Sequence, residues 1–142
     1  MLSIKRLSIE DARILIVGAS EKANEIGVPM CIAISDESGN LIAFERMNGG
    51  KSHSIQISQD KAFTAGASRK ATADYNAANQ PGQLAFGIHA AHQGRMSTVG
   101  GGIPIKVGED FVGGIGISGG LPTQDIECAE AGIAHFLASL EK

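Results

Sequence analysis

Residues 28–47 read VPMCIAISDESGNLIAFERM and predict the β-hairpin around which the rest of the fold is organised. Two apolar runs, 28–34 and 41–47, flank the polar cluster 36–40. β-branched and aromatic residues favour strands, whereas Asp, Ser, Gly and Asn between them favour a tight reversal of the chain. The hairpin therefore places an antiparallel pair of strands near the start of the domain.

Helical periodicity is found on both sides of this hairpin. Apolar residues recur every three or four positions over residues 8–26, and Gly27 follows as a stop. Three further stretches favour helix: 54–67, 70–78 and 123–140. The candidate N-caps of the long helices are Ser8, Ser52 or Ser54, and Thr123 or Asp125. For residues 83–94 a helical turn is suggested by the apolar spacing but weakened by Gly87.

Residues 94–120 contain ten glycines. Within them, the runs 103–107 and 111–117 flank a Gly-Glu-Asp turn and predict a second hairpin. The preceding glycines at 100–102 lead into a strand, whereas a phosphate-binding loop leads into a helix, so a nucleotide site is not expected. The structural interpretation is that these glycines allow tight bends and close backbone packing.

The whole chain, residues 1–142, is expected to form a single α+β domain with helices packed on an antiparallel sheet. A net charge of −3 and only one Tyr and no Trp argue against nucleic-acid binding or attraction to an anionic membrane surface. No apolar run approaches the ~20 residues that a membrane span needs. Cys31 and Cys128 are expected to be buried free thiols, which favours a cytoplasmic location.

Two histidines, His89 and His92, are three positions apart and would share one face of a helix. Imidazoles in this arrangement can bind a metal ion or haem iron, or act as general acid and base. No third ligand has a recognisable spacing, since His53 and His135 are remote in sequence. The alternative interpretation is a pair of half-exposed loop histidines.

Lys61 shares a helical face with Ile57 and Thr64, so we expect it to turn toward the sheet, line a pocket and pair with the carboxylate of a ligand. The alternative is a surface lysine whose stem covers apolar residues. Residues expected to add positive charge or backbone N–H donors are Arg46, Arg69, Arg95, Gly100, Gly101 and Gly102. We expect the site where residues 83–94 meet the three glycines.

Several motifs occur in a fixed order along nearly the whole chain. They are SIEDA (8–12), DESGNLIAFERM (36–47), DKAFTA (60–65), GGIPI (101–105), VGGIGISG (112–119) and DIECAEAG (125–132). Together they resemble the haem-binding/haem-degrading domain family, which is GlcG-like and related to the C-terminal domain of the propanediol-utilisation adenosyltransferase. The resemblance implies a profilin-like α+β fold with a five-stranded antiparallel sheet, a homo-oligomer, and haem as cofactor. Some members use a histidine on the first helix, whereas this chain has none before His53.

The leading hypothesis is a cytoplasmic oligomer that binds haem or another tetrapyrrole and degrades it weakly. His89 or His92 would approach the iron, and the further axial candidates are Met47, Met96 and Tyr75. The basic side chains of Lys61, Arg46, Arg69 or Arg95 would meet the propionates. Two alternatives stay open. One is a tautomerase, isomerase or hydrolase acting on a small carboxylated catabolite in a diol or aromatic degradation pathway, with a histidine as acid and base. The other is an accessory oligomer without chemistry of its own.

Overall fold

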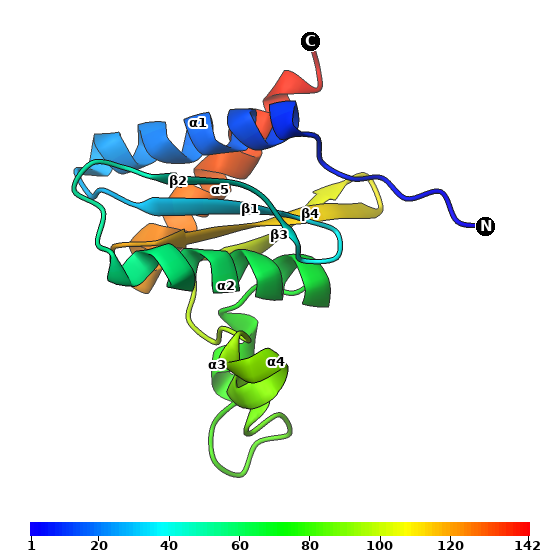
Figure 1. Cartoon of the computed structure of the whole chain (residues 1–142), viewed down its shortest axis with the longest axis vertical. Coiled ribbons are helices and arrows are strands. Elements are labelled where there is room, and N and C mark those ends of the chain that lie inside the picture. The colour runs from blue at the N-terminus through cyan, green and yellow to red at the C-terminus, as the bar shows by residue number, and fades with distance from the viewer.

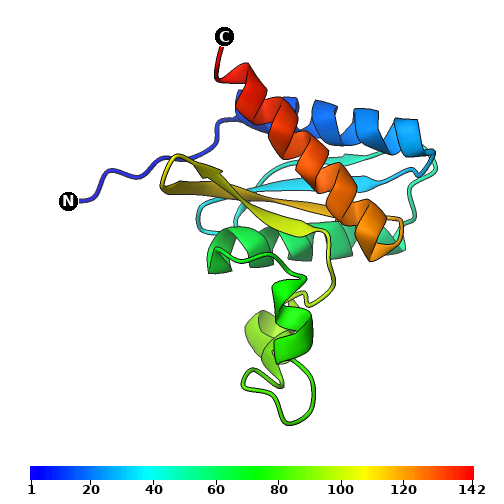
Figure 2. The same ribbon diagram turned by 180° about the vertical axis from the view of Figure 1, so that it is seen from behind.

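The computed structural model describes all residues, 1–142, and arranges them in three layers with the sheet in the middle. Helices α1 and α5 pack against each other over one face of the sheet, and α2 covers the other face (Figures 1 and 2). The helices are α1 (Ile9–Ile26), α2 (His53–Ser68), α3 (Asp74–Ala78), the 3-10 turn η1 (Ile88–Ala90), α4 (Ala91–Gly94) and α5 (Pro122–Ser139). The strands are β1 (Cys31–Asp36), β2 (Leu41–Arg46), β3 (Gly102–Val107) and β4 (Asp110–Ser118).

The sheet has four strands in the order β2-β1-β4-β3, and every neighbouring pair is antiparallel. The α+β class is therefore confirmed, but the expectation of five strands was wrong. The chain between α2 and β3 forms short helices and turns instead of a strand. Gly82, Gly87 and Gly94 adopt positive φ there, and such a backbone cannot continue an extended ladder.

The first hairpin forms as expected from residues 28–47. Ile32 pairs with Glu45 and Ile34 with Ala43 across β1 and β2. The turn is closed by Asp36, whose Oδ1 accepts the backbone N–H of Ser38 at 2.9 Å and that of residue 40 at 3.0 Å. This Asx-type turn explains why the polar cluster reverses the chain at that point.

The caps of the long helices agree with the sequence only in part. Ser8 caps α1 as expected, because its Oγ accepts the N–H of Asp11 at 3.1 Å while Asp11 Oδ2 accepts the N–H of Ser8 at 2.8 Å. Helix α2 begins at His53 after Ser52, whose side chain makes no capping bond. Ser52 is thus the N-cap residue, and the alternative cap Ser54 lies inside α2. Helix α5 follows Leu121 and starts with Pro122, so the expected caps Thr123 and Asp125 were wrong. A proline in the first turn needs no N–H partner.

The glycines of β4 bring α2 unusually close to the sheet. A Cβ added to Gly116 would lie 2.1 Å from the carbonyl oxygen of Ser58, and one added to Gly114 would lie 2.6 Å from the backbone N of Gly66. The alternate residues Ile115 and Ile117 belong to the hydrophobic core. The strand therefore presents backbone to α2 and large side chains to α1 and α5, which confirms the close-packing interpretation of the glycines.

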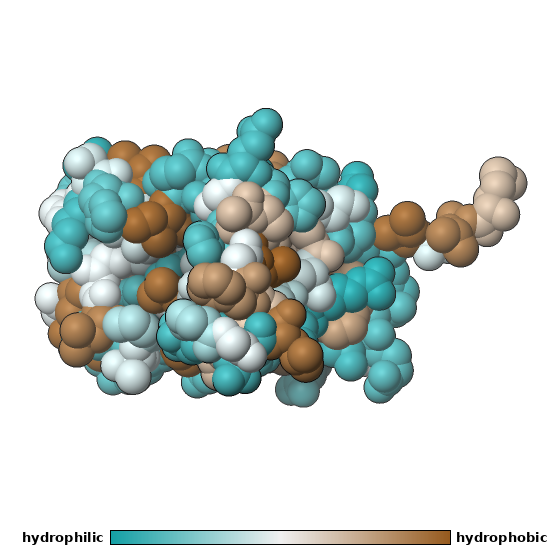
Figure 3. Space-filling model, turned by 90° about the horizontal axis from the view of Figure 1, so that it is seen from below, coloured by the Kyte–Doolittle hydropathy of each residue, from teal (hydrophilic) through white to brown (hydrophobic).

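The segment between α2 and β3, residues 69–101, projects below α2 and carries α3, η1 and α4 (Figure 1). Leu84 and Phe86 are exposed on it. The face viewed from below shows apolar residues dispersed among hydrophilic ones, and the N-terminal tail extends beyond the body (Figure 3). None of the helices has the length and apolar character that crossing a membrane requires.

Candidate functional site

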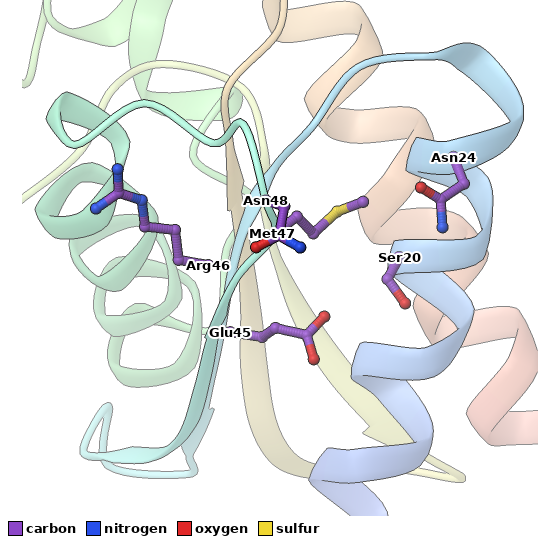
Figure 4. Close-up of a pocket in the computed structure, with 6 residues that line it drawn as sticks. All are labelled: Ser20, Asn24, Glu45, Arg46, Met47 and Asn48. Atoms are coloured by element: carbon purple, nitrogen blue, oxygen red, sulfur yellow. The ribbon is translucent and has the colours of Figure 1, made fainter.

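A cavity of about 430 Å³ lies between α1 and the end of β2 (Figure 4). Its lining residues are Ser20, Asn24, Glu45, Arg46, Met47 and Asn48. The side chains of Glu45 and Met47 point toward α1, whereas that of Arg46 leaves the strand toward α2. This cavity brings together Arg46 and Met47, two of the expected cofactor residues, with Ser20 and Asn24, for which the sequence analysis gave no signal.

Hydrogen bonds fix the position of Met47 and Arg46. Met47 Sδ accepts the backbone N–H of Met30 at 3.4 Å, and the Met47 N–H donates to the Met30 carbonyl at 3.0 Å. Arg46 Nε donates to the carbonyl of Gly50 at 3.0 Å. The second lone pair of the thioether sulfur is not used by this hydrogen bond.

A second cavity, of about 290 Å³, lies between the N-terminal ends of α2 and α5 and the loop after β4. Its lining residues are Lys51, His53, Ser54, Ile57, Lys61, Val99, Ser118, Gly119, Gly120, Pro122 and Asp125. Lys61 is 1% exposed, and its Nζ donates to the carbonyl of Ile117 at 2.8 Å and to Asp125 Oδ2 at 3.0 Å. Lys61 therefore lines a pocket, as expected, and is not a surface lysine.

The Lys61–Asp125 pair is buried on both sides. Burial lowers the pKa of Lys61, and the charge of Asp125 opposes this shift. Burial likewise raises the pKa of Asp125, while the charge of Lys61 and the N–H of Gly120, at 2.9 Å from Oδ1, favour the carboxylate. Each group thus depends on the other to remain charged in the interior.

Two serines complete the inner part of this cavity. Ser54, on the first turn of α2, and Ser118, at the end of β4, are both buried, and their hydroxyls are hydrogen-bonded at 3.0 Å. Lys51 and His53 are exposed at the rim. Sequence reasoning missed the two serines, His53 and Asp125. One signal was present: Asp125 precedes the buried Ala129 by one helical turn, which places an acid on the apolar face of α5.

The three glycines at 100–102, the last of which begins β3, border Lys61, and one of the N–H donors expected there is already engaged. Gly100, Gly101 and Gly102 are all buried. A Cβ on Gly101 would lie 2.7 Å from Lys61 Nζ, and the Gly102 N–H donates to Thr72 Oγ1 at 3.0 Å. Their evident role is to let the lysine side chain and the sheet approach each other closely.

His89 and His92 lie on the projecting segment, and neither lines either cavity. The expected common helix face was wrong, because His92 has a left-handed backbone (φ 54°) that breaks α4. His89 Nδ1 lies 3.1 Å from Asn79 Oδ1, and the His92 ring packs edge-on to Phe63 with 5.2 Å between centroids. Both imidazoles are exposed, and no three His, Cys, Asp or Glu side chains gather as a metal site.

The remaining candidates are engaged elsewhere. The guanidinium carbon of Arg95 lies 4.3 Å from the Phe63 ring centroid, and Arg95 Nε donates to Asp60 Oδ1 at 3.0 Å. Arg69 lies 5.5 Å from the Phe111 ring centroid. Met96 is buried, and Tyr75 packs beneath the ammonium of Lys70. The structure therefore divides the expected site residues among the α1–β2 cavity, the Lys61 cavity and the projecting segment.

The fold and the order of the motifs define a family. The model of the HbpS-like family, described as haem degrading protein HbpS-like, matches residues 7–134. The chain belongs to this family, which confirms the resemblance noted in the sequence. It is also 36% identical over 128 residues to the corrinoid adenosyltransferase PduO of Citrobacter freundii, covering 90% of this chain but only 38% of PduO.

Two solved structures are similar over nearly their full length. The Klebsiella pneumoniae protein ORFY superposes with a TM-score of 0.95 and 30% identity, covering 97% of this chain and 95% of ORFY. The structure described as a PduOC:haem complex superposes with a TM-score of 0.88 and 34% identity, covering 92% of this chain and 94% of PduOC. The relative in that second structure carries haem on the same fold.

Proposed function

We propose that this protein binds haem in the α1–β2 cavity. The observation that carries the proposal is the likeness to the PduOC:haem complex, with 34% identity and a TM-score of 0.88 over nearly the whole domain. Membership of a family named for haem degradation supports the same cofactor. The cavity lies at the end of an edge strand, beside a side chain that is able to ligate iron.

The residues present in this cavity fit haem at its polar edge and at the metal. Met47 would hold the iron through its thioether, as methionine does in some haem proteins. Ser20 and Asn24 would supply hydrogen bonds to a propionate from α1, and Arg46 would reach a propionate only by turning from its direction toward α2. When bound, haem itself supplies the redox chemistry, and the protein's part is to hold and orient it.

The cavity does not cover the apolar faces of a macrocycle by itself. Met47 is the only hydrophobic residue among the six that line it. Val17, one turn before Ser20 on α1, is 44% exposed at this side of the molecule. We infer that a second copy of the chain covers the bound haem, so that binding and homo-oligomerisation are coupled.

Haemin titration tests this proposal. The wild-type protein should give a saturable shift of the Soret band, and Met47→Leu should abolish the shift while Met96→Leu, a buried methionine outside the cavity, should retain it. No Soret shift in the wild type would overturn haem binding. If Met47→Leu still shifts the Soret band and the His89→Ala/His92→Ala variant does not, the residue that ligates the iron lies on the projecting segment instead.

Degradation is a separate step to test on the same samples. We propose that the bound haem is slowly degraded, which a progressive loss of the Soret band with ascorbate in air would support. The Met47→Leu variant serves as the matched control. It should not bind haem, so the Soret decay in its presence gives the rate for haem that is free in solution, and the wild type should decay faster. A stable Soret band in the wild type would restrict the function to binding.

A further inference from the structure

The haem proposal leaves unused the Lys61 cavity, where four polar side chains are buried together. Lys61 is 1%, Ser54 2%, Asp125 2% and Ser118 6% exposed. Polar groups are costly to bury, so such a cluster next to an open cavity needs a physical explanation. The Lys61–Asp125 ion pair accounts for two of these groups but not for the paired serines.

The cluster has hydrogen-bond donors that no protein acceptor uses. A lysine ammonium carries three protons, and Lys61 uses two of them, on the Ile117 carbonyl and on Asp125. The Ser54 and Ser118 hydroxyls share one hydrogen bond, so one of their two protons stays free. Both carboxylate oxygens of Asp125 already accept bonds. The cavity therefore offers free donors to a ligand that accepts hydrogen bonds.

The charge distribution around the cavity favours an anion. Because Lys61 and Asp125 neutralise each other, the exposed ammonium of Lys51 at the rim gives the lining a net positive charge. The N-terminal ends of α2 and α5, helices of 16 and 18 residues, both border the cavity. Each end contributes a partial positive charge from its helix dipole.

The remaining wall is hydrocarbon. Ile57, Val99 and Pro122 also line the cavity. The volume of about 290 Å³ lies at the lower limit of the roughly 300–1,000 Å³ that drug-sized ligands occupy, so the cavity suits a small molecule. An inorganic anion would leave the apolar wall without a partner.

We propose that this cavity is a second binding site, independent of haem, that takes the carboxylate of a small organic acid. The Lys61 ammonium and the free serine hydroxyl donate to the carboxylate, Lys51 attracts it, and Ile57 and Val99 contact its short hydrocarbon chain. Gly119 and Gly120 line the cavity beside the end of β4, so their amides report on a bound ligand.

The test uses the haem-free protein with acetate, butyrate and glutarate as probes. Titration followed by ¹⁵N-resolved NMR should shift the amide signals of Gly119 and Gly120 saturably with at least one of these acids. Butyramide, which has the shape of butyric acid but no charge, should cause no saturable shift. The absence of saturation with all three acids overturns the proposal. Inorganic phosphate that binds as tightly as the acids overturns the assignment to an organic ligand.

Variants locate the site. Ser54→Ala and Lys51→Glu should each weaken binding of the acid about tenfold or more, because each removes a hydrogen bond or a charge that the carboxylate uses. Lys106→Glu, on β3, is the matched control and should bind as the wild type does. Lys51 is exposed, so Lys51→Glu should fold even if Ser54→Ala, which alters a buried side chain, does not. Unchanged affinity in both Ser54→Ala and Lys51→Glu excludes this cavity, and the Soret titration of the same variants reports on haem separately.

Discussion

The ammonium of Lys61 and the carboxylate of Asp125 lie 3.0 Å apart with both side chains almost fully buried. The pair joins α2 and α5, which lie on opposite faces of the sheet (Figures 1 and 2). The Lys61 side chain lies next to the start of β3, where Gly101 leaves space for it. One ion pair thus ties together the two outer layers of the domain and forms the floor of a cavity.

Removing one partner of this pair should destabilise the protein strongly. Lys61→Met leaves Asp125 buried without its counter-charge, a change that typically costs about 3–5 kcal/mol. The free energy of unfolding in urea measures this loss. The Lys61→Met/Asp125→Asn variant should recover a large part of it, because no unpaired charge remains and Asn can still accept the Gly120 N–H. Equal stability of Lys61→Met and the wild type would show that the pair is not formed.

The N-terminal tail should give the protein a pH-dependent contact. Arg6 Nε donates to Glu37 Oε2 at 2.8 Å, and this hydrogen bond, with the charge of Arg6, lowers the pKa of Glu37 from 4.5 to about 2. The native state therefore holds this proton more weakly than the unfolded state. The stabilisation is present above pH 4.5 and is lost as the pH falls toward about 2.

Urea unfolding across this pH range tests the contact. The Glu37→Gln variant should show a flatter acid limb than the wild type, and added salt should reduce the difference because Arg6 is exposed. Glu109→Gln is the matched control, because that carboxylate is exposed and makes only a long contact, at 3.8 Å, with the ammonium of Lys106. Identical acid limbs in the wild type and Glu37→Gln would contradict the assignment.

The two cysteines should be inert in the native protein. Both are buried free thiols, as the sequence indicated. Burial, with the charges of Asp125 and Glu127, raises the pKa of Cys128 to about 11, and burial also raises that of Cys31. A thiol reagent at pH 7 should therefore label neither in native buffer and both in guanidinium, since the thiolate is the reactive form. Rapid labelling of either native thiol would contradict this burial.

The parts of the fold that the sequence predicted are those fixed by local patterns. The hairpin at 28–47 follows from alternating apolar runs and turn residues, and the burial of Lys61 follows from its place on an apolar helix face. The expectation of a fifth strand, which the resemblance implied, was wrong. The chain there has a Pro81-Gly82 break and further glycines with positive φ.

The second cavity could not be assembled from the sequence because its parts are distant along the chain. Ser54 and Ser118 are 64 positions apart, as are Lys61 and Asp125. Their contact depends on how α2 and α5 pack on β4, and no local spacing reports that packing. The shared helix face of His89 and His92 was predicted from a local spacing that the backbone does not follow. Their spacing is helical, but the backbone of His92 is left-handed.

The glycines of β4 give a direct test of this packing. Gly116→Ala should cost about 3 kcal/mol or more of unfolding free energy, because the new Cβ would meet the backbone of α2 at Ser58, which cannot move aside as a flexible side chain would. Gly82→Ala is the control. Nothing lies within 4 Å of its added Cβ, so the only expected loss of unfolding free energy, roughly 1 kcal/mol, comes from placing an alanine at a positive φ. Equal losses in the two variants would contradict the close contact between α2 and β4.

The protein should be a homo-oligomer whose assembly covers the α1–β2 cavity, where we propose that haem binds. The exposed Val17 lies on α1 one turn from Ser20, and β2, which borders the same cavity, is an edge strand with an unpaired side. Light scattering at micromolar concentration should give a mass that is a multiple of 14.7 kDa. Val17→Glu should shift the mass toward the monomer and weaken haemin binding in parallel, whereas Leu84→Glu, on the projecting segment, should change neither. A stable wild-type monomer would refute the assembly, and haemin binding that survives in a monomeric Val17→Glu would show that one chain completes the site alone.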